Sequence, residues 1–291
     1  MSWVKKGINH LVLLAIGLVW VYPFLWMISA SFKSQNEFFN NRLGLIPQAP
    51  TLDNIKRIWV KANFGSYFLN TVVVTCFAVV LVLIITMLAG YAMGRYKFVG
   101  RNLMMGIFVG SIAIPLVSTI IPTYEVVKGM HLTGTKTGLV LAQAGGAHVI
   151  FLMLFTSFFA SIPMELEEAA KIDGCSDIGI FFKIILPLSK PVLASISLFY
   201  AVGHWNDYFS AMLYIRDPNK EVVQIALRRI VLLAGGANPD GSPIDFGDFG
   251  APPEKAVKMA ATMVSTVPIL VVYPFVQKYF TQGVMVGAVK G

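Results

Sequence analysis

The sequence predicts an all-α, polytopic membrane protein with six transmembrane helices in a single domain over residues 1–291. Its 291 residues are 56% hydrophobic and only 13% charged, with a mean hydropathy of +0.70, whereas soluble domains carry about 25% charged residues. The apolar residues gather in six long runs, as expected for helices that cross a bilayer. These two observations together exclude an ordinary soluble globular fold.

The first run, residues 11–31, follows two lysines, as the apolar core of a secretory signal also would. That core is usually about 7–15 residues long, and this run is longer. Three aromatic residues lie towards its far end: Trp20, Tyr22 and Trp26. Aromatic side chains of this kind gather at membrane interfaces. We therefore expect an uncleaved first span, followed by a mixed polar segment outside the membrane, residues 32–68.

The second span, residues 71–94, contains no charged residue. It is followed by a short connector that holds Arg95, Lys97 and Arg101 and no acidic residue. Because basic residues in short loops mark the cytoplasmic side, we place this connector in the cytoplasm. The third span, residues 103–124, crosses back and is interrupted by two prolines.

The same orientation assigns the rest of the chain. The predicted segments are a fourth span (138–160), a cytoplasmic loop (161–187), a fifth span (191–215), an outside segment (216–258), a sixth span (259–276) and a cytoplasmic tail (277–291). The outside segment is expected to hold an amphipathic helix from Asp217 to Leu233. Both termini are therefore predicted to be cytoplasmic.

The loop over residues 161–187 is predicted to contain two short helices joined by a glycine. Pro163 suits the first turn of the first helix. Gly174 can adopt the left-handed conformation just past its end. Ser176 is a good cap for the second helix, which Pro187 would end.

This loop carries a pattern that resembles the EAA loop of the membrane subunits of ABC importers. Three residues separate a Glu-Ala-Ala triplet from a glycine, and nine more lead to an isoleucine, one further residue and Leu-Pro. The candidate coupling residues are Glu168, Ala169, Ala170, Asp173, Gly174, Ile184, Leu186 and Pro187. In that family the loop is a coupling helix that seats in a cleft of a cytoplasmic ATPase. The resemblance thus implies a type I ABC importer permease fold and contact with an ATPase through these residues.

Two further stretches are similar to the second permease of maltose-type carbohydrate importers: the Trp-Asn-Asp-Tyr run at residues 205–208 and the C-terminal tail. In that family the tail reaches between the two ATPases, which implies ATPase contacts at Gly283 and Gly287. The outside segment and the His-Trp-Asn-Asp run look closest to permeases for oligosaccharides. Some of those import acidic, uronate-bearing oligosaccharides such as alginate fragments, and this adds acidic sugars to the candidate substrates.

The fifth span also carries polar residues that are costly in lipid, where a charge near a helix centre costs about 2.5–3.5 kcal/mol. Such residues should face the bundle interior or a wet cavity. On a continuous helix, five of them fall near one face: Ser197, Tyr200, His204, Asp207 and Tyr208. The candidate substrate path consists of Tyr200, His204, Trp205, Asn206, Asp207 and Tyr208, with Gln143 and His148 as weaker candidates. The alternatives are a polar cluster that only satisfies neighbouring helices, or an Asp207 at the outer interface.

Other kinds of chemistry find little support. The stretch from Gly129 to Thr137 resembles a phosphate-binding loop with one residue inserted, but no β-strand pattern precedes it, so we expect no ATP binding by this chain. The four histidines lie on different spans or sides, and no nucleophile accompanies them, so no enzyme activity, cofactor or metal is expected. The net charge of +8 is scattered among apolar runs, which does not favour nucleic acid.

The resemblance further implies a multi-pass subunit of the bacterial cytoplasmic membrane with several partners. These are a second, homologous permease, an ATPase dimer that holds ATP and Mg²⁺, a periplasmic or lipid-anchored sugar-binding protein, membrane lipid and the oligosaccharide. Two alternatives remain: an ion-coupled secondary transporter that uses Asp207, and an ABC permease for a solute other than a sugar.

Overall fold

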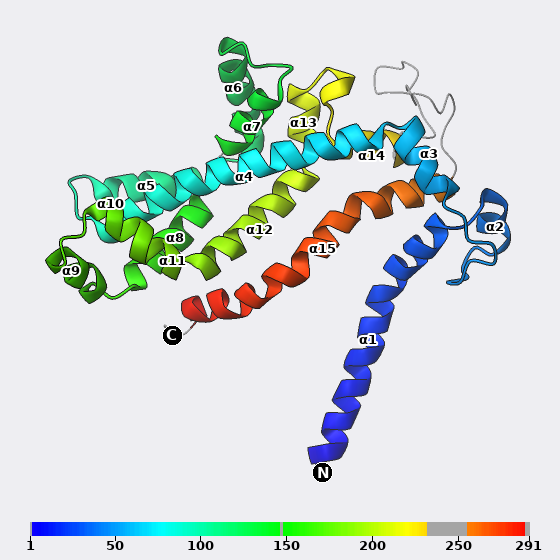
Figure 1. The fold of residues 1–291 in the computed structure, drawn as a ribbon, viewed down its shortest axis with the longest axis horizontal. Helices are drawn as coiled ribbons and strands as arrows, with labels where there is room; N and C mark the ends of the chain where they lie inside the picture. The colour runs from blue at the N-terminus through cyan, green and yellow to red at the C-terminus, as the bar shows by residue number, and fades with distance from the viewer. Residues whose placement is uncertain (1, 146–147, 232–254, 289–291) are drawn as a thin grey trace. The chain divides into compact units, whose positions relative to one another are not determined.

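The computed structural model describes residues 2–145, 148–231 and 255–288, and every regular element in these ranges is helical (Figure 1). This agrees with the predicted all-α class. The elements, in chain order, are α1 (Ser2–Ser31), α2 (Gln35–Asn40), α3 (Asp53–Lys61), α4 (Phe64–Arg95), α5 (Arg101–Ser111), α6 (Leu116–Gly129), α7 (Lys136–Ala144), α8 (Val149–Ser161), α9 (Glu165–Ile172), α10 (Asp177–Ile180), the π-helical η1 (Phe181–Ile185), α11 (Leu186–Leu188), α12 (Lys190–Asn206), α13 (Tyr208–Tyr214), the 3₁₀-helical η2 (Pro218–Lys220), α14 (Val223–Val231) and α15 (Lys255–Ala288).

Within the described part of the chain, three helices are long and apolar enough to cross a membrane on their own: Lys6–Ser31, Phe64–Arg95 and Lys255–Phe275. They correspond to the predicted first, second and sixth spans. Three pairs of helices pass the same test only together, with bends of 106° between α5 and α6, 59° between α7 and α8, and 75° between α10–α11 and α12. Six spans result if each bent pair counts as one, so the count and the sides of the loops stay predictions.

The predicted third, fourth and fifth spans are not continuous helices, and the fourth is divided between α7, which ends at Ala144, and α8, which begins at Val149. Pro115 stands at the N-cap of α6, directly after the break that follows α5. Pro122 lies inside α6, so only the first of the two prolines interrupts the helix. The predicted fifth span is divided at Asp207, which separates α12 from α13. The expected single polar face across this point is therefore wrong.

The chain forms two compact units, residues 1–69 with 222–268 and residues 70–221 with 269–291. In the first unit, a buried cluster joins α3, α14 and the first turns of α4 and α15. Its members are Ile58, Phe64, Tyr67, Val223, Ala226, Ile230, Val257, Ala260 and Ala261. The single permease domain over residues 1–291 stays a prediction.

The amphipathic helix predicted from Asp217 begins later than expected. The Asp217 carboxylate accepts the Asn219 N–H at 3.0 Å and closes a 3₁₀ turn over residues 218–220. Such a local bond competes with an α-helix, and α14 begins only at Val223. The structure describes this helix as far as Val231, and its predicted end at Leu233 lies outside the described residues.

A buried lysine orders the polar segment after α1. Lys33 is 1% exposed, and its ammonium donates to the carbonyls of Asn41, at 2.8 Å, and Gly44. Nearby, the buried Glu37 carboxylate accepts the N–H groups of Gln48 and Ala49. Because these charges are met by backbone groups, an otherwise irregular segment holds a defined fold.

The second unit is built on a close approach of α4 and α8. A Cβ added at Gly90 would lie 2.5 Å from the Phe155 Cβ, and one at Gly94 would lie 2.8 Å from the Thr156 carbonyl oxygen. Small residues of this kind let helix backbones come together in membrane proteins. The surrounding core includes Tyr91, Phe155, Phe159, Ile180, Phe181, Ile185, Ile196 and Tyr200.

Candidate functional site

The first helix of the loop over residues 161–187, hereafter the coupling loop, ends as the sequence predicts. After α9, Gly174 has φ +80°, in the left-handed region. Its N–H donates to the Lys171 carbonyl at 3.0 Å, and the Cys175 N–H donates to the Ala170 carbonyl at 2.9 Å. This pair of bonds is a Schellman motif, which satisfies the last carbonyls of α9. The glycine is therefore required by the backbone conformation of the turn.

The second half of the loop is one bent helical stretch, α10–η1–α11. Ser176 caps it by accepting the Gly179 N–H at 3.2 Å. Two predictions about prolines are wrong in detail. Pro163 precedes Met164, the N-cap of α9, and so lies outside the first turn. Pro187 lies within α11, directly after the π turn, because a proline is tolerated at the start of a helical segment where its missing donor is not needed.

The coupling loop has a buried face and an exposed face. The buried face packs on the rest of the second unit. Its residues are Glu167, Ala170, Ile180, Phe181 and Ile185. Five large apolar side chains are exposed: Met164, Leu166, Ile172 (87%), Ile178 (73%) and Phe182 (59%). Of the predicted coupling residues, Glu168, Ala169, Asp173, Gly174 and Pro187 are exposed, Ile184 and Leu186 are half-buried, and Ala170 is buried. The exposed set offers acidic and apolar groups together.

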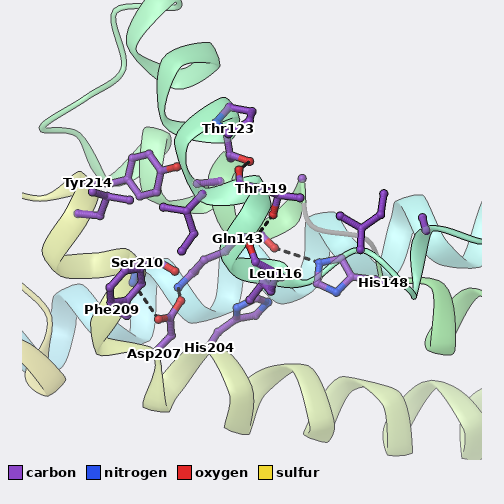
Figure 2. A pocket seen from close by; sticks show the side chains of 17 residues that line it. Leu116, Thr119, Thr123, Gln143, His148, His204, Asp207, Phe209, Ser210 and Tyr214 are labelled. Carbon is purple, nitrogen blue, oxygen red and sulfur yellow. Dashed lines mark hydrogen bonds between the residues drawn. The ribbon is translucent and has the colours of Figure 1, made fainter.

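A second feature of the same unit is a cavity of about 530 Å³ that is lined by both polar and apolar side chains. Its walls come from α6, α7, α13 and the ends of α5 and α12 (Figure 2). The polar lining groups are Ser111, Thr119, Thr123, Gln143, His148, His204, Asp207, Ser210 and Tyr214. Among the described residues, no lysine or arginine lines the cavity.

Asp207 is held in this cavity by two hydrogen bonds. One carboxylate oxygen, Oδ1, accepts the Ser210 N–H at 3.0 Å and caps α13. The other, Oδ2, accepts from Gln143 Nε2 at 3.1 Å. His148 Nε2 lies 3.0 Å from the Gln143 carbonyl oxygen, and the ring centroids of His148 and His204 are 6.4 Å apart. Figure 2 shows these side chains converging from α7, from the N-cap of α8, and from α12 and the junction between α12 and α13.

The structure brings together only part of the predicted substrate path. His204 and Asp207 line the cavity, and so do both weaker candidates, Gln143 and His148. The other four predicted residues do not line it: Tyr200 and Trp205 are buried, while Asn206 and Tyr208 are exposed. Tyr200 instead packs against His148, at 4.9 Å between ring centroids.

The cavity offers hydrogen bonds to a polar ligand. Two buried atoms in its walls, Gln143 Oε1 and His204 Nε2, have no hydrogen-bond partner among the described residues. Unmet polar atoms of this kind are costly, and because both are buried, a ligand would reach them only after the side chains turn toward the cavity. Apolar side chains such as Leu116 and Phe209 complete the lining. This mixture suits a molecule with many hydroxyl groups and apolar ring faces.

Comparison with known protein families identifies the chain. Residues 86–286 match the family described as the inner membrane component of binding-protein-dependent transport systems. The chain belongs to this family. The predicted resemblance to ABC-importer membrane subunits, which was drawn from the coupling loop, is thereby confirmed.

Individual relatives cover nearly the whole chain of this family member. The polygalacturonan/rhamnogalacturonan transport system permease protein YtcP of Bacillus subtilis is 40% identical over 279 residues, 96% of each chain. Protein LplC of the same organism is 38% identical over 283 residues, 97% of this chain and 94% of LplC. A crystal structure of a bacterial ABC transporter involved in the import of the acidic polysaccharide alginate matches with a TM-score of 0.81 and 29% identity, covering 96% of this chain and 98% of the other. The fold is therefore that of a type I ABC importer permease.

Sequence reasoning missed residues at both sites. In the cavity it missed the hydroxyl groups of Thr119 and Thr123, which resemble any others in an apolar run. At the coupling loop it counted Arg95 and Glu167 only as charges, although they form a buried ion pair. Gly283 and Gly287 lie in α15, whose helical backbone is described as far as Ala288. The side-chain surroundings of this tail lie outside the described part of the chain.

Proposed function

We propose that the chain is the membrane-spanning permease subunit of an ABC importer that carries oligosaccharides into the bacterial cytoplasm, driven by ATP hydrolysis in partner subunits. The coupling loop carries this proposal. Its Schellman turn at Gly174 presents Glu168 and Asp173 beside exposed apolar residues, as a loop that docks on an ATPase requires. Family membership over residues 86–286 supports the same role.

The proposed substrate is an oligosaccharide, with acidic, uronate-bearing oligosaccharides as the first candidates. One relative is named for polygalacturonan and rhamnogalacturonan transport, and a similar structure comes from an importer of alginate. The cavity supports a sugar through its hydroxyl, amide, imidazole and carboxylate groups. Because it holds Asp207 and no lysine or arginine, a uronate carboxylate would have to lie away from Asp207 or approach it through a cation.

The proposed partners are a second, similar permease, an ATPase dimer that binds ATP and Mg²⁺, and a periplasmic or lipid-anchored sugar-binding protein. The most apolar part of α1, within Lys6–Ser31, has no buried residue, which leaves its surface for lipid or for the second permease. The proposed topology places the coupling loop, the tail and both termini in the cytoplasm. In the proposed cycle, ATP closes the ATPases, the coupling loop moves with them, and the spans open outwards to accept sugar.

Uptake into proteoliposomes tests this function. The chain is reconstituted with its partner subunits, and uptake of labelled oligogalacturonate is measured with and without internal ATP and with an ionophore. We expect uptake that needs ATP and ignores the ionophore. Uptake that persists without ATP and collapses with the ionophore would instead establish the ion-coupled alternative. If the partner binding protein binds no sugar in a panel, a non-sugar solute becomes the better assignment.

The same assay with Asp207→Asn tests the cavity. Asparagine can still cap α13, and the Gln143 amide can turn to accept from it, so the fold should hold. We expect neutral oligosaccharide uptake to fall partly, by about tenfold or less, because asparagine keeps a neutral acceptor in place of the charged one. Uptake of acidic oligosaccharides should fall less or rise, because a like charge is removed. Equal, unchanged uptake of both classes would remove Asp207 from the substrate path.

A further inference from the structure

A buried ion pair joins the coupling loop to α4. Arg95, the last residue of α4, places its Nε 2.7 Å from Oε1 of Glu167 in α9. The two side chains are only 4% and 8% exposed. Glu167 directly precedes the Glu168 of the coupling pattern.

The same guanidinium also binds the end of α8. Arg95 Nη1 donates to the carbonyl oxygens of Phe159, at 3.1 Å, and Ile162, at 2.7 Å. These groups lie at the C-terminal end of α8, where carbonyls lack helical partners and the helix dipole favours a cation. One side chain therefore holds three acceptors, from α8, its C-cap and α9, in a fixed arrangement that only the planar guanidinium fork provides.

One turn earlier, the same face of α4 contacts the second half of the loop. The Tyr91 ring lies 4.9 Å from that of Phe181 and 5.6 Å from that of Phe159, measured between centroids. Tyr91 and Arg95 are four residues apart and so lie on one face of the helix. Both halves of the coupling loop thus contact the C-terminal (inner) end of α4. The first half does so through the Arg95–Glu167 ion pair and the second half through the contact between Tyr91 and Phe181.

We propose that Arg95 and Glu167 form a positioning pair that makes α9, the end of α8 and the inner end of α4 move as one body, so that displacement of the coupling loop reaches the transmembrane helices. A buried ion pair is a poor source of stability, because desolvation offsets its attraction. What it supplies is a unique arrangement of the groups it joins. This inference rests on the proposed function, since the motion it transmits is that of an ATPase-driven loop.

The test uses the reconstituted complex with its ATPase and binding protein and measures oligosaccharide taken up per ATP hydrolysed. The decisive variant is Arg95→Met with Glu167→Met, which removes both charges and leaves neither buried alone. Apolar replacement of a whole buried pair is usually tolerated by the fold. We expect the complex to assemble and the uptake per ATP to fall about fivefold or more, the range of measured coupling effects.

Matched variants separate coupling from folding. Glu125→Met with Lys128→Met removes an exposed ion pair on α6 and should keep the wild-type ratio. Glu167→Gln keeps an acceptor for the guanidinium but leaves the buried Arg95 charge without a counter-charge, so we expect poorer assembly and take the ratio only from complexes that form. Arg95→Lys keeps the charge but loses the planar fork whose Nε and Nη1 reach separate acceptors, so the ratio should fall. If the double variant does not assemble, the uptake per ATP of Arg95→Lys tests the positioning pair instead.

The possible failures are distinguishable. A wild-type ratio in the assembled double variant, or in Arg95→Lys where that variant decides, would overturn the positioning pair and leave the proposed function intact. Absence of ATP-driven uptake in the wild-type complex would overturn the proposed function and this inference with it.

Discussion

At Gly174 an added Cβ would meet no atom within 4 Å, so the obstacle to a side chain is the backbone conformation alone, with φ +80°. A left-handed conformation costs a non-glycine residue about 1–2 kcal/mol and more for a β-branched one. The turn cannot relax freely, because the N–H groups of Gly174 and Cys175 close the Schellman motif. The orientation of α9 relative to α10 therefore depends on this one residue.

We predict that Gly174→Val assembles but loses most of its coupling. The turn must open to relieve the strain, which changes how α9 and α10 meet the ATPase. Uptake and substrate-stimulated ATP turnover in proteoliposomes should both fall severalfold, and Gly174→Asn should be milder because asparagine tolerates this conformation. Wild-type values in Gly174→Val would contradict the assignment of this turn to coupling.

Gly134 supplies the matched control for that variant. It has a similar φ of +77°, again with no atom within 4 Å of an added Cβ, but lies between α6 and α7. Gly134→Val should lower thermal stability by a similar amount while leaving uptake and substrate-stimulated ATP turnover unchanged. Equal loss of coupling in both variants would mean that strain in general, rather than this turn, is responsible.

Asp207 shows what residue-level reasoning could and could not predict. A carboxylate in an apolar run is costly, and this alone indicated that it should face a cavity. The same sequence, however, is compatible with a helix that continues and with one that ends and is capped again. The Ser210 N–H and the Gln143 amide decide between them, and Gln143 is 64 residues away in the sequence. Trp205, Asn206 and Tyr208 were expected beside Asp207 because a continuous helix had been assumed.

At the scale of elements, the contact between α4 and α8 depends on two glycines on one face of α4. We predict that Gly90→Ala lowers stability by about 1–3 kcal/mol, the usual cost of overpacking. The added Cβ would sit 2.5 Å from the Phe155 Cβ, so the helices must separate. The effect is measured by heating the purified complex and monitoring the fraction that remains assembled.

Gly106→Ala is the control, because a Cβ there meets no atom within 4 Å and alanine favours the helix. It should leave the melting temperature unchanged or slightly raised. If Gly90→Ala is as stable as Gly106→Ala, α4 and α8 do not pack as closely as described.

Helices were predicted well where a single apolar run determines them. They were predicted poorly where contacts with residues far away in the sequence determine where a helix ends or what it packs against. The helices α1, α4 and α15 correspond to runs long enough to span a membrane. The break before Pro115 was signalled by the proline, and the turn at Gly174 by a glycine after a helical pattern. The Arg95–Glu167 pair joins residues 72 positions apart. In the sequence alone, each of the two residues resembles an ordinary charged residue at the protein surface. Local pattern carries no information about such a contact.

At the scale of the whole molecule, the family was predictable because the coupling pattern has fixed residues at fixed spacing. Its match over residues 86–286 includes the coupling loop and most of the tail. The substrate is harder to predict from the sequence than the family. The cavity is assembled from five helices, and its hydroxyl, amide and imidazole groups occur in many proteins. The partners, too, are implied by the family, and we propose them on that ground.

The tail tests how this chain acts within the complete complex. We predict that deletion of residues 283–291 leaves assembly intact and lowers ATP turnover severalfold. The residues from Gly283 to Ala288 are small or apolar, too few to form a core, and continue the backbone of α15 beyond the predicted sixth span. A tail that reaches between the ATPases would affect hydrolysis, whereas a frayed end would affect nothing. A second variant, with the same nine residues replaced by a Gly-Ser sequence of equal length, separates chain length from sequence. Turnover in the purified complex that matches wild type in both variants would leave the tail without a role in the ATPase.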